Sequence, residues 1–241
     1  MYDTLADVYD WLVPEALLEP EGSAAAFAPV VAELRAGARV LDCACGTGTL
    51  AVGLALRGFE VSASDASEAM VERTRALAAA HGVRVEARVR VWEELDGGPF
   101  DAVFCVGNSI THARDRRAAL AGMRGVVRER SGDEASGRGS GGLFAVTSRT
   151  WELPQEEGEE VVERGGRRAR VRHTWHPGEL EVAVTLDGAT HAERLAYWPF
   201  THEELQADLI ASGFEPEAST FSLEAPRYLV TSRANSSNAS R

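Results

Sequence analysis

The chain has 241 residues, of which 44% are hydrophobic, and its formal net charge at pH 7 is −12. This length predicts one α/β domain with additions rather than two full domains, and the apolar content excludes a disordered chain. The negative charge opposes binding to a polyanion because the arginines are not clustered into an obvious basic face, so we expect no nucleic-acid partner.

Cysteine usage and the first residues bear on the compartment. Cys43, Cys45 and Cys105 fall in predicted buried strands or the loop beside them, and we interpret them as small buried hydrophobes in a reducing compartment. A Cys-x-Cys pair without a second pair does not complete a metal site, so we expect neither a metal nor a disulfide. The acidic start and the lack of a long apolar run indicate no signal peptide and no membrane span. We expect a soluble, cytoplasmic protein.

Residues 1–35 combine scattered aromatic and leucine side chains with a run rich in alanine and valine from 23 to 34. The pattern predicts two helices joined near Pro20-Glu21-Gly22. Two interpretations stay open for this segment. Either it packs on the sheet as ordinary structure, or its Tyr9 and Trp11 belong to a lid over a ligand site.

The stretch 39–54 organises the chain. A short apolar run ends in Asp42, a turn with Gly46 and Gly48 follows, and apolar residues then recur at helical spacing. This order predicts a strand, a tight loop and a helix, as in the first βα unit of a Rossmann-type sheet. The glycines permit turn conformations and a close ligand approach, and the N–H groups of the helix start face the ligand.

Two ligand classes use such a loop. Gly46-x-Gly48-x-x-Ala51 fits the dinucleotide fingerprint in form, with alanine in the place of the third glycine. Asp65 ends the second apolar run, where a carboxylate can accept hydrogen bonds from both hydroxyls of a ribose. Asp42, four residues before the first glycine, suits a cationic ligand better than a pyrophosphate. The acid in the first motif therefore favours a cation over a dinucleotide.

Strands and helices alternate after this unit. We predict strands at 39–43, 60–64, 83–91, 102–106 and 143–148, and helices at 49–57, 67–81 and 116–128. Strands separated by helices predict a mostly parallel sheet with right-handed crossovers. Residues 131–142 are small, polar and glycine-rich, which is typical of a flexible loop.

The pattern changes between residues 159 and 199. Alternating apolar residues are separated by Gly165-Gly166, Pro177-Gly178 and Asp187-Gly188. These are hairpin signals, so the segment is predicted to be an antiparallel meander with one covered face.

The remaining segments complete the core. A helix is predicted at 201–212, where Thr201 and Glu204 form a capping box, and strands at 218–223 and 228–232 close the sheet. The chain is thus divided into an N-terminal helical lid (1–35), a Rossmann-like core (36–150), an antiparallel β meander over the ligand site (151–200), a C-terminal helix and strand pair (201–233) and a loose tail (234–241).

Two motifs carry a resemblance to a known family. Asp42-x-Ala44-Cys45-Gly46-Thr47-Gly48, followed by Ser64-Asp65-Ala66-Ser67 and Met70, resembles motifs I and II of the class I S-adenosylmethionine (SAM) methyltransferases. Together with Phe100-Asp101-Ala102-Val103-Phe104-Cys105-Val106-Gly107-Asn108-Ser109, the first motif resembles the glycine and sarcosine N-methyltransferases. The resemblance implies an α/β fold with a Rossmann-like, mostly parallel sheet, an antiparallel last strand and an antiparallel β insertion over the active site.

The resemblance also implies a cofactor, SAM, with S-adenosylhomocysteine (SAH) as its product. Ala44 and Gly46 would face the amino-acid portion of SAM, Asp65 would hold the ribose hydroxyls, and Trp92 would form a wall for the adenine. The structural alternatives are a helix-start acid for Asp65 and a core residue for Trp92. Val91 stands where the similar enzymes carry a polar asparagine. The candidate cofactor-binding residues are Asp42, Ala44, Cys45, Gly46, Gly48, Asp65, Ala66, Met70, Val91, Trp92, Val106, Gly107, Tyr9 and Trp11.

Acceptor residues are expected at the same edge of the sheet. Asn108 follows the fourth strand, and Arg149 follows the fifth, where the resemblance implies an arginine that binds the carboxylate of an amino acid. Tyr197 would close the pocket from the meander. The alternatives are a turn role for Asn108, an ion pair of Arg149 with Glu152, and plain aromatic packing of Tyr197. Methyl transfer from SAM needs orientation rather than a strong base, so we expect no catalytic acid–base group and treat His112 as structural.

We therefore predict a SAM-dependent methyltransferase acting on a small amine that bears a carboxylate, such as glycine or sarcosine. A methyltransferase for a larger natural product and a catalytically silent SAM-binding protein are the alternatives, and Asp42 disfavours a dinucleotide oxidoreductase. The expected partner is a small-molecule substrate, without nucleic acid or membrane, and a homo-oligomer is compatible with the sequence.

Overall fold

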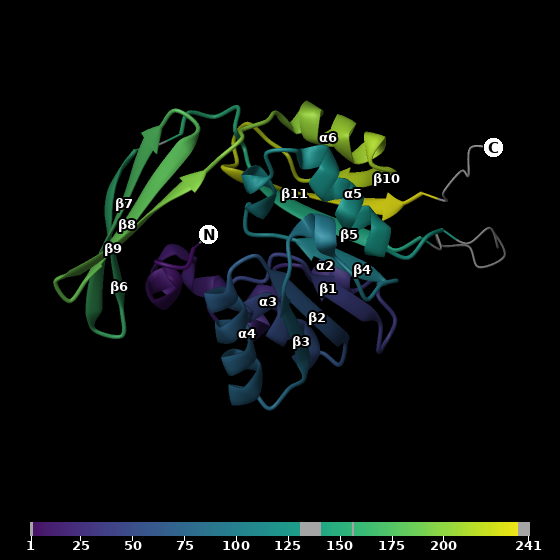
Figure 1. Cartoon of the computed structure of the whole chain (residues 1–241), viewed down its shortest axis with the longest axis horizontal. Coiled ribbons are helices and arrows are strands. Elements are labelled where there is room, and N and C mark those ends of the chain that lie inside the picture. Colours follow the sequence, from purple (N-terminus) through teal and green to yellow (C-terminus); the bar gives the residue numbers. More distant parts are fainter. Residues whose placement is uncertain (1, 131–140, 156, 236–241) are drawn as a thin grey trace.

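The computed structural model describes residues 2–130, 141–155 and 157–235. Its strands form two separate sheets, which Figure 1 shows side by side. The larger sheet consists of β1 (Arg39–Asp42), β2 (Glu60–Asp65), β3 (Val85–Val89), β4 (Ala102–Cys105), β5 (Leu143–Arg149), β10 (Phe214–Ser219) and β11 (Arg227–Ala234). The smaller sheet consists of β6 (Gly158–Arg164), β7 (Arg167–His176), β8 (Glu179–Leu186) and β9 (Ala189–Ala196).

The larger sheet has the strand order β10-β11-β5-β4-β1-β2-β3. Its first five strands in the chain pair in parallel, β11 pairs antiparallel with β5, and β10 pairs antiparallel with β11. The order reverses beside β1, so the ends of β1 and β4 border the crevice where open α/β sheets bind ligands. The predicted mixed α/β sheet with an antiparallel last strand is confirmed.

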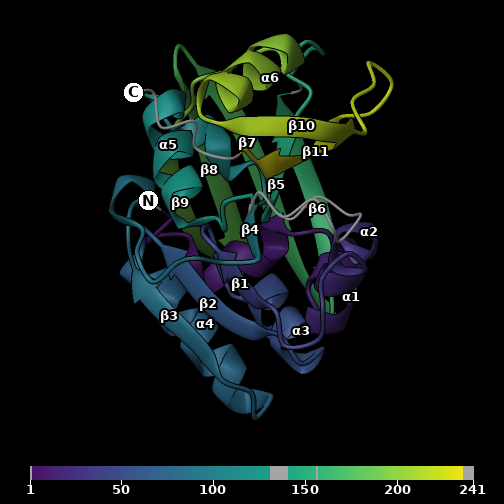
Figure 2. The same ribbon diagram turned by 90° about the vertical axis from the view of Figure 1, so that its right-hand side faces the viewer.

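Helices cover both faces of this sheet. They are α1 (Pro20–Ala25), α2 (Ala28–Val31), α3 (Thr49–Leu56), α4 (Glu68–Ala80), α5 (Arg116–Val126) and α6 (His202–Ala211). Successive side chains of a strand point to opposite faces. Val40 accordingly joins the core beneath α1, α3 and α4, while Leu41 joins the core beneath α5 and α6. Figure 2 shows α5 and α6 lying apart from α3 and α4.

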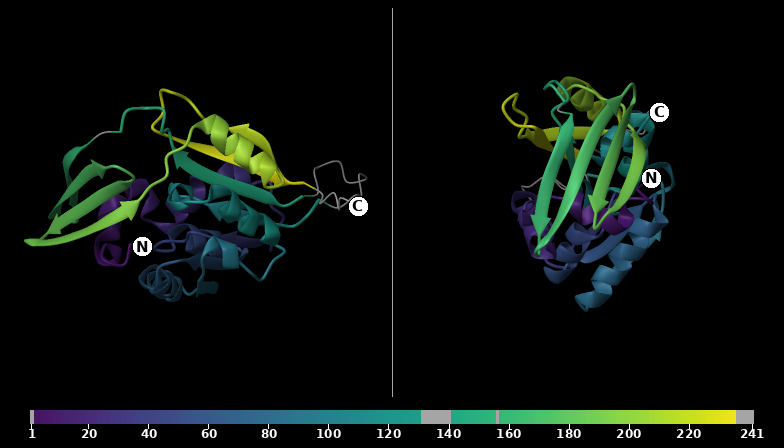
Figure 3. Two further views of the ribbon diagram at one scale, coloured as in Figure 1. Left: turned by 45° about the horizontal axis from the view of Figure 1, so that its top comes forward. Right: turned by 90° about the vertical axis from the view of Figure 1, so that its left-hand side faces the viewer.

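The smaller sheet is the predicted antiparallel meander. Its strands pair in chain order, and the Asp187-Gly188 turn has φ of 51° and 83° at its two residues, as a tight type I′ hairpin requires. One face of the sheet buries Val171, Val184 and Leu195 against Leu5 and Val8 of the N-terminal segment. The views in Figure 3 show this sheet standing beside the N-terminal segment, away from the main sheet.

The N-terminal region differs from the prediction of two helices joined near residue 20. It forms two short 3₁₀ segments, η1 (Ala6–Leu12) and η2 (Glu15–Leu17), followed by the short helices α1 and α2. Pro20 is the first residue of α1 rather than a break. The N–H groups of the first helical turn have no partner within the helix, so a proline, which has no N–H, is tolerated there. Gly53 lets α1 lie directly on α3, since a Cβ there would come within 2.0 Å of the Pro20 carbonyl oxygen.

Other boundaries were predicted more closely. The capping box of α6 is present, with Thr201 and Glu204 exchanging hydrogen bonds. The strand expected at 218–223 instead runs from Phe214 to Ser219, because it begins directly after Gly213 and an irregularity at Pro216 hides its alternation. Most of the predicted loop (131–140) and of the tail (236–241) lies outside the described residues. Within the described chain, the three cysteines are free and buried, and no helix is long and apolar enough to cross a membrane.

We predict opposite changes in stability when two helical glycines are replaced by alanine. We expect Gly53→Ala to lower the free energy of unfolding by about 1–3 kcal/mol, because its Cβ meets the backbone of α1. Gly125 in α5 has no atom near its Cβ position, so Gly125→Ala should raise stability by up to about 1 kcal/mol through helix propensity. Chemical denaturation of both variants tests this contrast, and an equally stabilised Gly53→Ala would contradict the close packing of α1 on α3.

Candidate functional site

Two neighbouring pockets open at the carboxyl ends of β1, β2 and β4. The first, here the β2-side pocket, has a volume of about 400 Å³ and is lined by Tyr2, Cys43, Ala44, Asp65, Ala66, Arg90, Val91, Trp92, Glu93, Ser109, His112, Ala113, Arg114 and Asp115. The second, here the β11-side pocket, has a volume of about 320 Å³. It is lined by Tyr9, Val13, Leu17, Ser23, Phe27, Asp42, Ala44, Cys45, Gly46, Thr47, Thr49, Leu50, Val106, Gly107, Ser109, Thr147, Thr220, Arg227, Tyr228 and Leu229. Ala44 and Ser109 line both pockets, so one elongated ligand can occupy the two.

The glycine loop after β1 forms the wall between α3 and the pockets. Gly46 has φ of 52° and lines the β11-side pocket. Gly48 has φ of 87° but lines neither pocket, because a Cβ there would come within 2.8 Å of the Thr74 backbone. The Thr74 hydroxyl also donates a hydrogen bond of 2.9 Å to the Gly46 carbonyl. Gly48 therefore serves the packing of the loop on α4, and Gly46 faces the ligand space.

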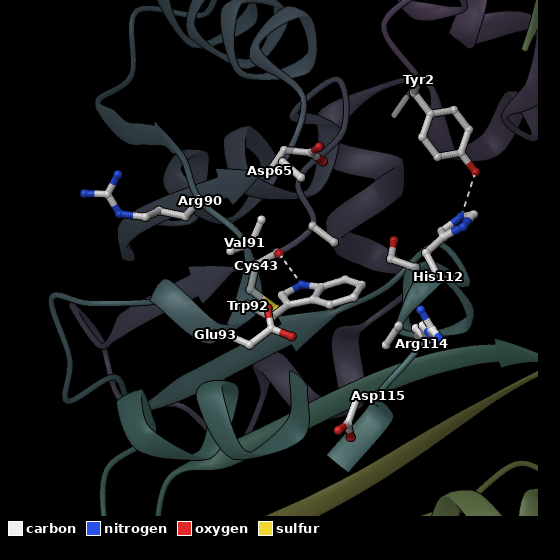
Figure 4. Close-up of a pocket in the computed structure, with 14 residues that line it drawn as sticks. Tyr2, Cys43, Asp65, Arg90, Val91, Trp92, Glu93, His112, Arg114 and Asp115 are labelled. Carbon is white, nitrogen blue, oxygen red and sulfur yellow. Dashed lines mark hydrogen bonds between the residues drawn. The ribbon is translucent and has the colours of Figure 1, made fainter. Parts of the chain in front are cut away.

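Asp65 ties the ends of β1 and β2 together. Its Oδ2 accepts a hydrogen bond of 3.0 Å from the Gly46 N–H, and its Oδ1 accepts one of 2.9 Å from the Ser67 N–H. Burial raises the pKa of Asp65, and these two N–H groups oppose that effect. Both oxygens keep further acceptor capacity toward the β2-side pocket, into which Figure 4 shows the carboxylate pointing.

Asp42 is a buried acid without a full set of partners. Its Oδ1 has no hydrogen-bond partner among the described residues, while the Ala44 N–H bonds to the carboxylate. Burial raises the pKa of Asp42 to about 7, and the nearby Asp65 adds to the rise. An unpartnered carboxylate oxygen in a pocket wall is complementary to a ligand with positive charge or a hydrogen-bond donor.

The floor of the β2-side pocket is aromatic. The Trp92 indole N–H donates a hydrogen bond of 2.8 Å to the Cys43 carbonyl, which fixes the ring in the centre of Figure 4. Val91 is 43% exposed, and Ala66 lines the same pocket. Met70 lies outside both pockets, because its side chain is 1% exposed in the core and its N–H donates to the Ser67 hydroxyl.

Tyr9 and Trp11 of the N-terminal segment have different surroundings. Tyr9 lines the β11-side pocket beside Gly46, and burial raises the pKa of Tyr9 to about 12. Trp11 turns the other way and packs on the smaller sheet, where the Arg164 guanidinium carbon lies 5.8 Å from its ring centroid. The segment therefore covers the site with one aromatic residue and anchors itself with the other.

The side chain of Asn108 is hydrogen-bonded to the backbone of Arg149. Asn108 has φ of 70°, and its Oδ1 accepts a hydrogen bond of 2.8 Å from the Arg149 N–H, which joins the ends of β4 and β5. The Arg149 guanidinium donates to Gln155 at 3.0 Å and its carbon lies 5.9 Å from the Trp175 ring centroid. Neither residue is among the described residues that line the β2-side and β11-side pockets. By contrast, Val106 and Gly107 line the β11-side pocket, where the Gly107 N–H donates to the Thr147 hydroxyl at 2.9 Å.

His112, Tyr2 and Tyr197 form a network, and of these three residues the sequence predicted only Tyr197 as part of the site. The Nδ1 of His112 lies 2.8 Å from the Ala196 carbonyl, which can only accept, so we infer that Nδ1 carries the proton. Its Nε2 then accepts from the Tyr2 hydroxyl at 3.0 Å, as the dashed line in Figure 4 shows. Burial lowers the pKa of His112, which keeps the ring neutral at pH 7.

Tyr197 completes this network without lining a pocket. Its hydroxyl is hydrogen-bonded to that of Tyr2, and its ring packs against His112, Trp151 and Trp175. The position of His112, four residues after Asn108, was a weak signal for a site residue. Tyr2 gave none, because a single aromatic residue in a segment without clear periodicity predicts no contact.

The fold and part of the chain are similar to those of known proteins. Residues 40–130 match a family described as a methyltransferase domain. A SAM-dependent methyltransferase from Clostridium acetobutylicum has the same fold, with a TM-score of 0.74 and 16% identity over 97% of this chain and 99% of that one. Residues 40–130 are therefore similar to a methyltransferase domain, and the chain has the fold of a SAM-dependent methyltransferase.

More particular relatives share parts of the chain. A glycine/sarcosine N-methyltransferase from Parasynechococcus marenigrum is 40% identical over 99 residues, which are 38% of this chain and 35% of the relative. The chain spans less than half the length of the curated relatives that it matches. A SAM-bound amino pentose methyltransferase from Micromonospora echinaspora, involved in calicheamicin biosynthesis, shares the fold with a TM-score of 0.69 and 21% identity over 97% of this chain and 98% of that one.

The raised pKa of Asp42 makes a prediction for stability. The pKa of an aspartate in an unfolded chain is about 3.9. Between that value and about 7, the folded protein holds a proton that the unfolded chain lacks, so this group lowers stability as pH rises. We expect Asp42→Asn to be more stable than the parent by about 1–3 kcal/mol at pH 8, with a smaller difference at pH 5. Thermal unfolding of the unliganded protein checks this.

A surface acid supplies the control for this comparison. Asp96, whose side chain is 56% exposed, is the control, and its change to asparagine should alter stability by no more than about 1 kcal/mol at either pH. An Asp42→Asn protein that is less stable than the parent at pH 8 would contradict the uncompensated burial of this carboxylate.

Proposed function

We propose that the chain is an active SAM-dependent methyltransferase and that SAM lies across both pockets. The adenosine would occupy the β2-side pocket, with Asp65 on the ribose and with Ala66, Val91 and Trp92 around the adenine. The observation that carries the proposal is the unpartnered buried oxygen of Asp42, which suits the cationic methionine part of SAM and would lie badly beside a pyrophosphate. Gly48 and Met70 would act by shaping the loop and α4.

The methionine part would occupy the β11-side pocket. Ala44, Cys45, Gly46, Val106 and Gly107 line that space, and Tyr9 covers it. The sulfonium centre would lie beside Ala44 and Ser109, which line both pockets. The fit is therefore supported by an acid at each pocket and by a loop whose backbone can approach the ligand.

The chain's contribution to the reaction is orientation and exclusion of water. When bound, SAM supplies a methyl group activated by its sulfonium centre, and an amine acceptor must present an uncharged nitrogen behind that methyl. Tyr2 and the neutral His112 line the β2-side pocket with Ser109, and since they are hydrogen-bonded to each other and uncharged, they do not repel a cationic ligand. Tyr197 and Trp11 pack in the core between the smaller sheet and the N-terminal segment, which holds that segment over the site.

The acceptor that we propose is a small amine bearing a carboxylate, such as glycine or sarcosine. Arg149 supports this proposal because it ends β5 at the ligand-binding edge and its guanidinium carbon lies 5.9 Å from the ring centroid of Trp175, which packs against Tyr197. Asn108 would position Arg149 through the hydrogen bond to its N–H. The matched glycine/sarcosine N-methyltransferase supports the same acceptor class.

A larger natural-product acceptor is the second candidate. The β11-side pocket extends past Gly107 to Thr220 and Arg227, which leaves room beyond a methionine chain. The structurally similar amino pentose methyltransferase also acts on an amine-bearing molecule larger than glycine, as its name states. An acceptor screen containing glycine, sarcosine and amino sugars separates the two candidates, and a lack of SAH with every acceptor would favour a silent SAM-binding protein.

Cofactor binding can be tested without an acceptor. Calorimetric titration should show micromolar binding of SAM and SAH and none of NAD. Asp65→Ala should weaken SAM binding by about tenfold or more, since it removes a charged acceptor from the ribose hydroxyls. Asp96→Ala is the matched control at an exposed acid. Binding of NAD in place of SAM would overturn the proposal, provided circular dichroism shows that each variant is folded.

The carboxylate role of Arg149 predicts a kinetic effect. With a turned-over amino acid, Arg149→Ala should raise the acceptor KM by about tenfold or more, because a positive charge near the acceptor carboxylate is lost. The SAM KM should stay near that of the parent. Arg168→Ala, at an arginine of the smaller sheet whose side chain is 69% exposed, is the control. An unchanged acceptor KM in Arg149→Ala would remove Arg149 from acceptor binding.

A further inference from the structure

The β11-side pocket has a charged group at each end. Asp42 ends β1 and Arg227 begins β11, and they are the only acid and the only arginine among the described residues that line this pocket. In the sheet, β4 and β5 lie between β1 and β11, so at about 4.8 Å per strand the two backbones are roughly 14 Å apart. The ammonium and carboxylate of a methionine share one carbon, so a methionine that meets Asp42 leaves Arg227 at the far end of the space.

Arg227 and Arg149 face each other across the antiparallel pair of β11 and β5. Their Cα atoms are register partners, and Leu229 and Thr147 are the next pair on the same face. Thr147, Leu229 and Arg227 all line the β11-side pocket. This face of the two strands is therefore part of the wall of the pocket, with Arg227 at its rim and Arg149 beside it on the neighbouring strand.

The start of β11 is held firmly beside Arg149. The Thr150 N–H donates to the Pro226 carbonyl at 3.0 Å, and the Thr150 hydroxyl donates to the Ala225 carbonyl at 2.7 Å. The backbone that presents Arg227 is thus fixed by the residue that follows Arg149. This arrangement fixes the direction in which the Arg227 side chain leaves the sheet.

The two arginines have different surroundings. Arg149 is half-buried, donates to Gln155 and stacks near Trp175, outside the pocket. Arg227 is exposed to the pocket, and no carboxylate of the described residues forms an ion pair with it. It exerts an electrostatic effect on Tyr9 and Tyr197, which belong to the N-terminal cover and to the segment after β9. Like charges directly opposite each other on a sheet are unfavourable, and an anion bound beside them relieves the repulsion.

We propose that Arg227 receives the acid group of the methyl acceptor, with the carboxylate as the ligand class. The inference rests on the proposed methyltransferase function and assigns the contact to a residue of the last strand. The Arg227 guanidinium offers two parallel N–H donors at the pocket rim, which match the two oxygens of a carboxylate. Arg149, on the adjacent strand, adds positive potential and holds the aromatic wall. An acid placed at Arg227 leaves the rest of the acceptor to extend past Thr147 and Gly107 toward Ser109.

The test uses acetate as a simple carboxylate and the full chain loaded with SAH. Acetate is titrated at constant ionic strength against chloride, and binding is followed by tryptophan fluorescence and calorimetry. We expect Arg227→Met to weaken acetate binding by about tenfold or more and Arg227→Lys to retain part of it, because lysine keeps the charge but loses the fork. Arg168→Met, at the exposed arginine of the smaller sheet, should bind acetate as the parent does.

Titrations with cofactors distinguish the carboxylate of the acceptor from the carboxylate of the methionine part of SAM. SAM, SAH and methylthioadenosine, which lacks the amino-acid group, should bind Arg227→Met as tightly as the parent. Loss of SAM affinity with methylthioadenosine affinity retained would place Arg227 on the methionine carboxylate and overturn the proposal. Equal acetate affinity in parent and Arg227→Met, or no acetate binding to the parent SAH complex, would also overturn it. A parent protein that binds neither SAM nor SAH would instead refute the proposed function.

Discussion

The site depends on two carboxylates held out of water at the ends of adjacent parallel strands. Asp65 accepts the N–H groups of Gly46 and Ser67, which sets the shape of the glycine turn relative to the start of α4. Asp42 is more deeply buried and keeps one oxygen without a partner. Since an uncompensated buried charge is unfavourable, the empty protein is under an electrostatic penalty at this point that a cationic ligand relieves. Stability and ligand affinity are therefore linked at Asp42.

The cover over these acids comes from the N-terminal segment, which is bound from both sides. Arg73 of α4 contacts the Ala6 carbonyl and pairs with Asp10 at 2.8 Å. On the other side, Glu193 of β9 accepts the N–H groups of Tyr2 at 2.6 Å and Thr4 at 3.0 Å. The segment thus connects the smaller sheet to the main domain, and the position of Tyr2 beside His112 follows from contacts made elsewhere.

Local sequence signals predicted the fold well where contacts between residues close in sequence decide the structure. The βα unit at 39–54 and the hairpins at Gly165-Gly166 and Asp187-Gly188 depend on residues close in sequence, and they were located within a few residues. The N-terminal region was misjudged because Pro20 begins a helix there and because packing on α3 through Gly53, rather than helical periodicity, decides its course. Propensity is a weak guide when tertiary contacts of this kind decide the structure.

The site was predictable to the extent that it lies on motifs. Asp42, Asp65 and Trp92 could be placed because strand ends in an open α/β sheet meet at one edge. Gly48 and Met70 share those motifs but support the loop and the core instead. Arg149 was placed at the correct edge, whereas the direction of its side chain depends on Gln155 and Trp175, and sequence spacing carries no information on such a choice.

The contacts that hold the N-terminal segment bear on the order in which the parts of the site form during synthesis. Tyr2 is bound by a carboxylate 191 residues further along the chain, and His112 receives its tautomer-fixing carbonyl from Ala196. During synthesis, residues 2–13 and the glycine loop exist long before β9 does. Contacts of such long range form late and slowly. The strand ends and the glycine loop that line the β2-side pocket can therefore take shape early, whereas the contacts that hold Tyr2 beside His112 are completed only once the last hairpin of the smaller sheet has formed.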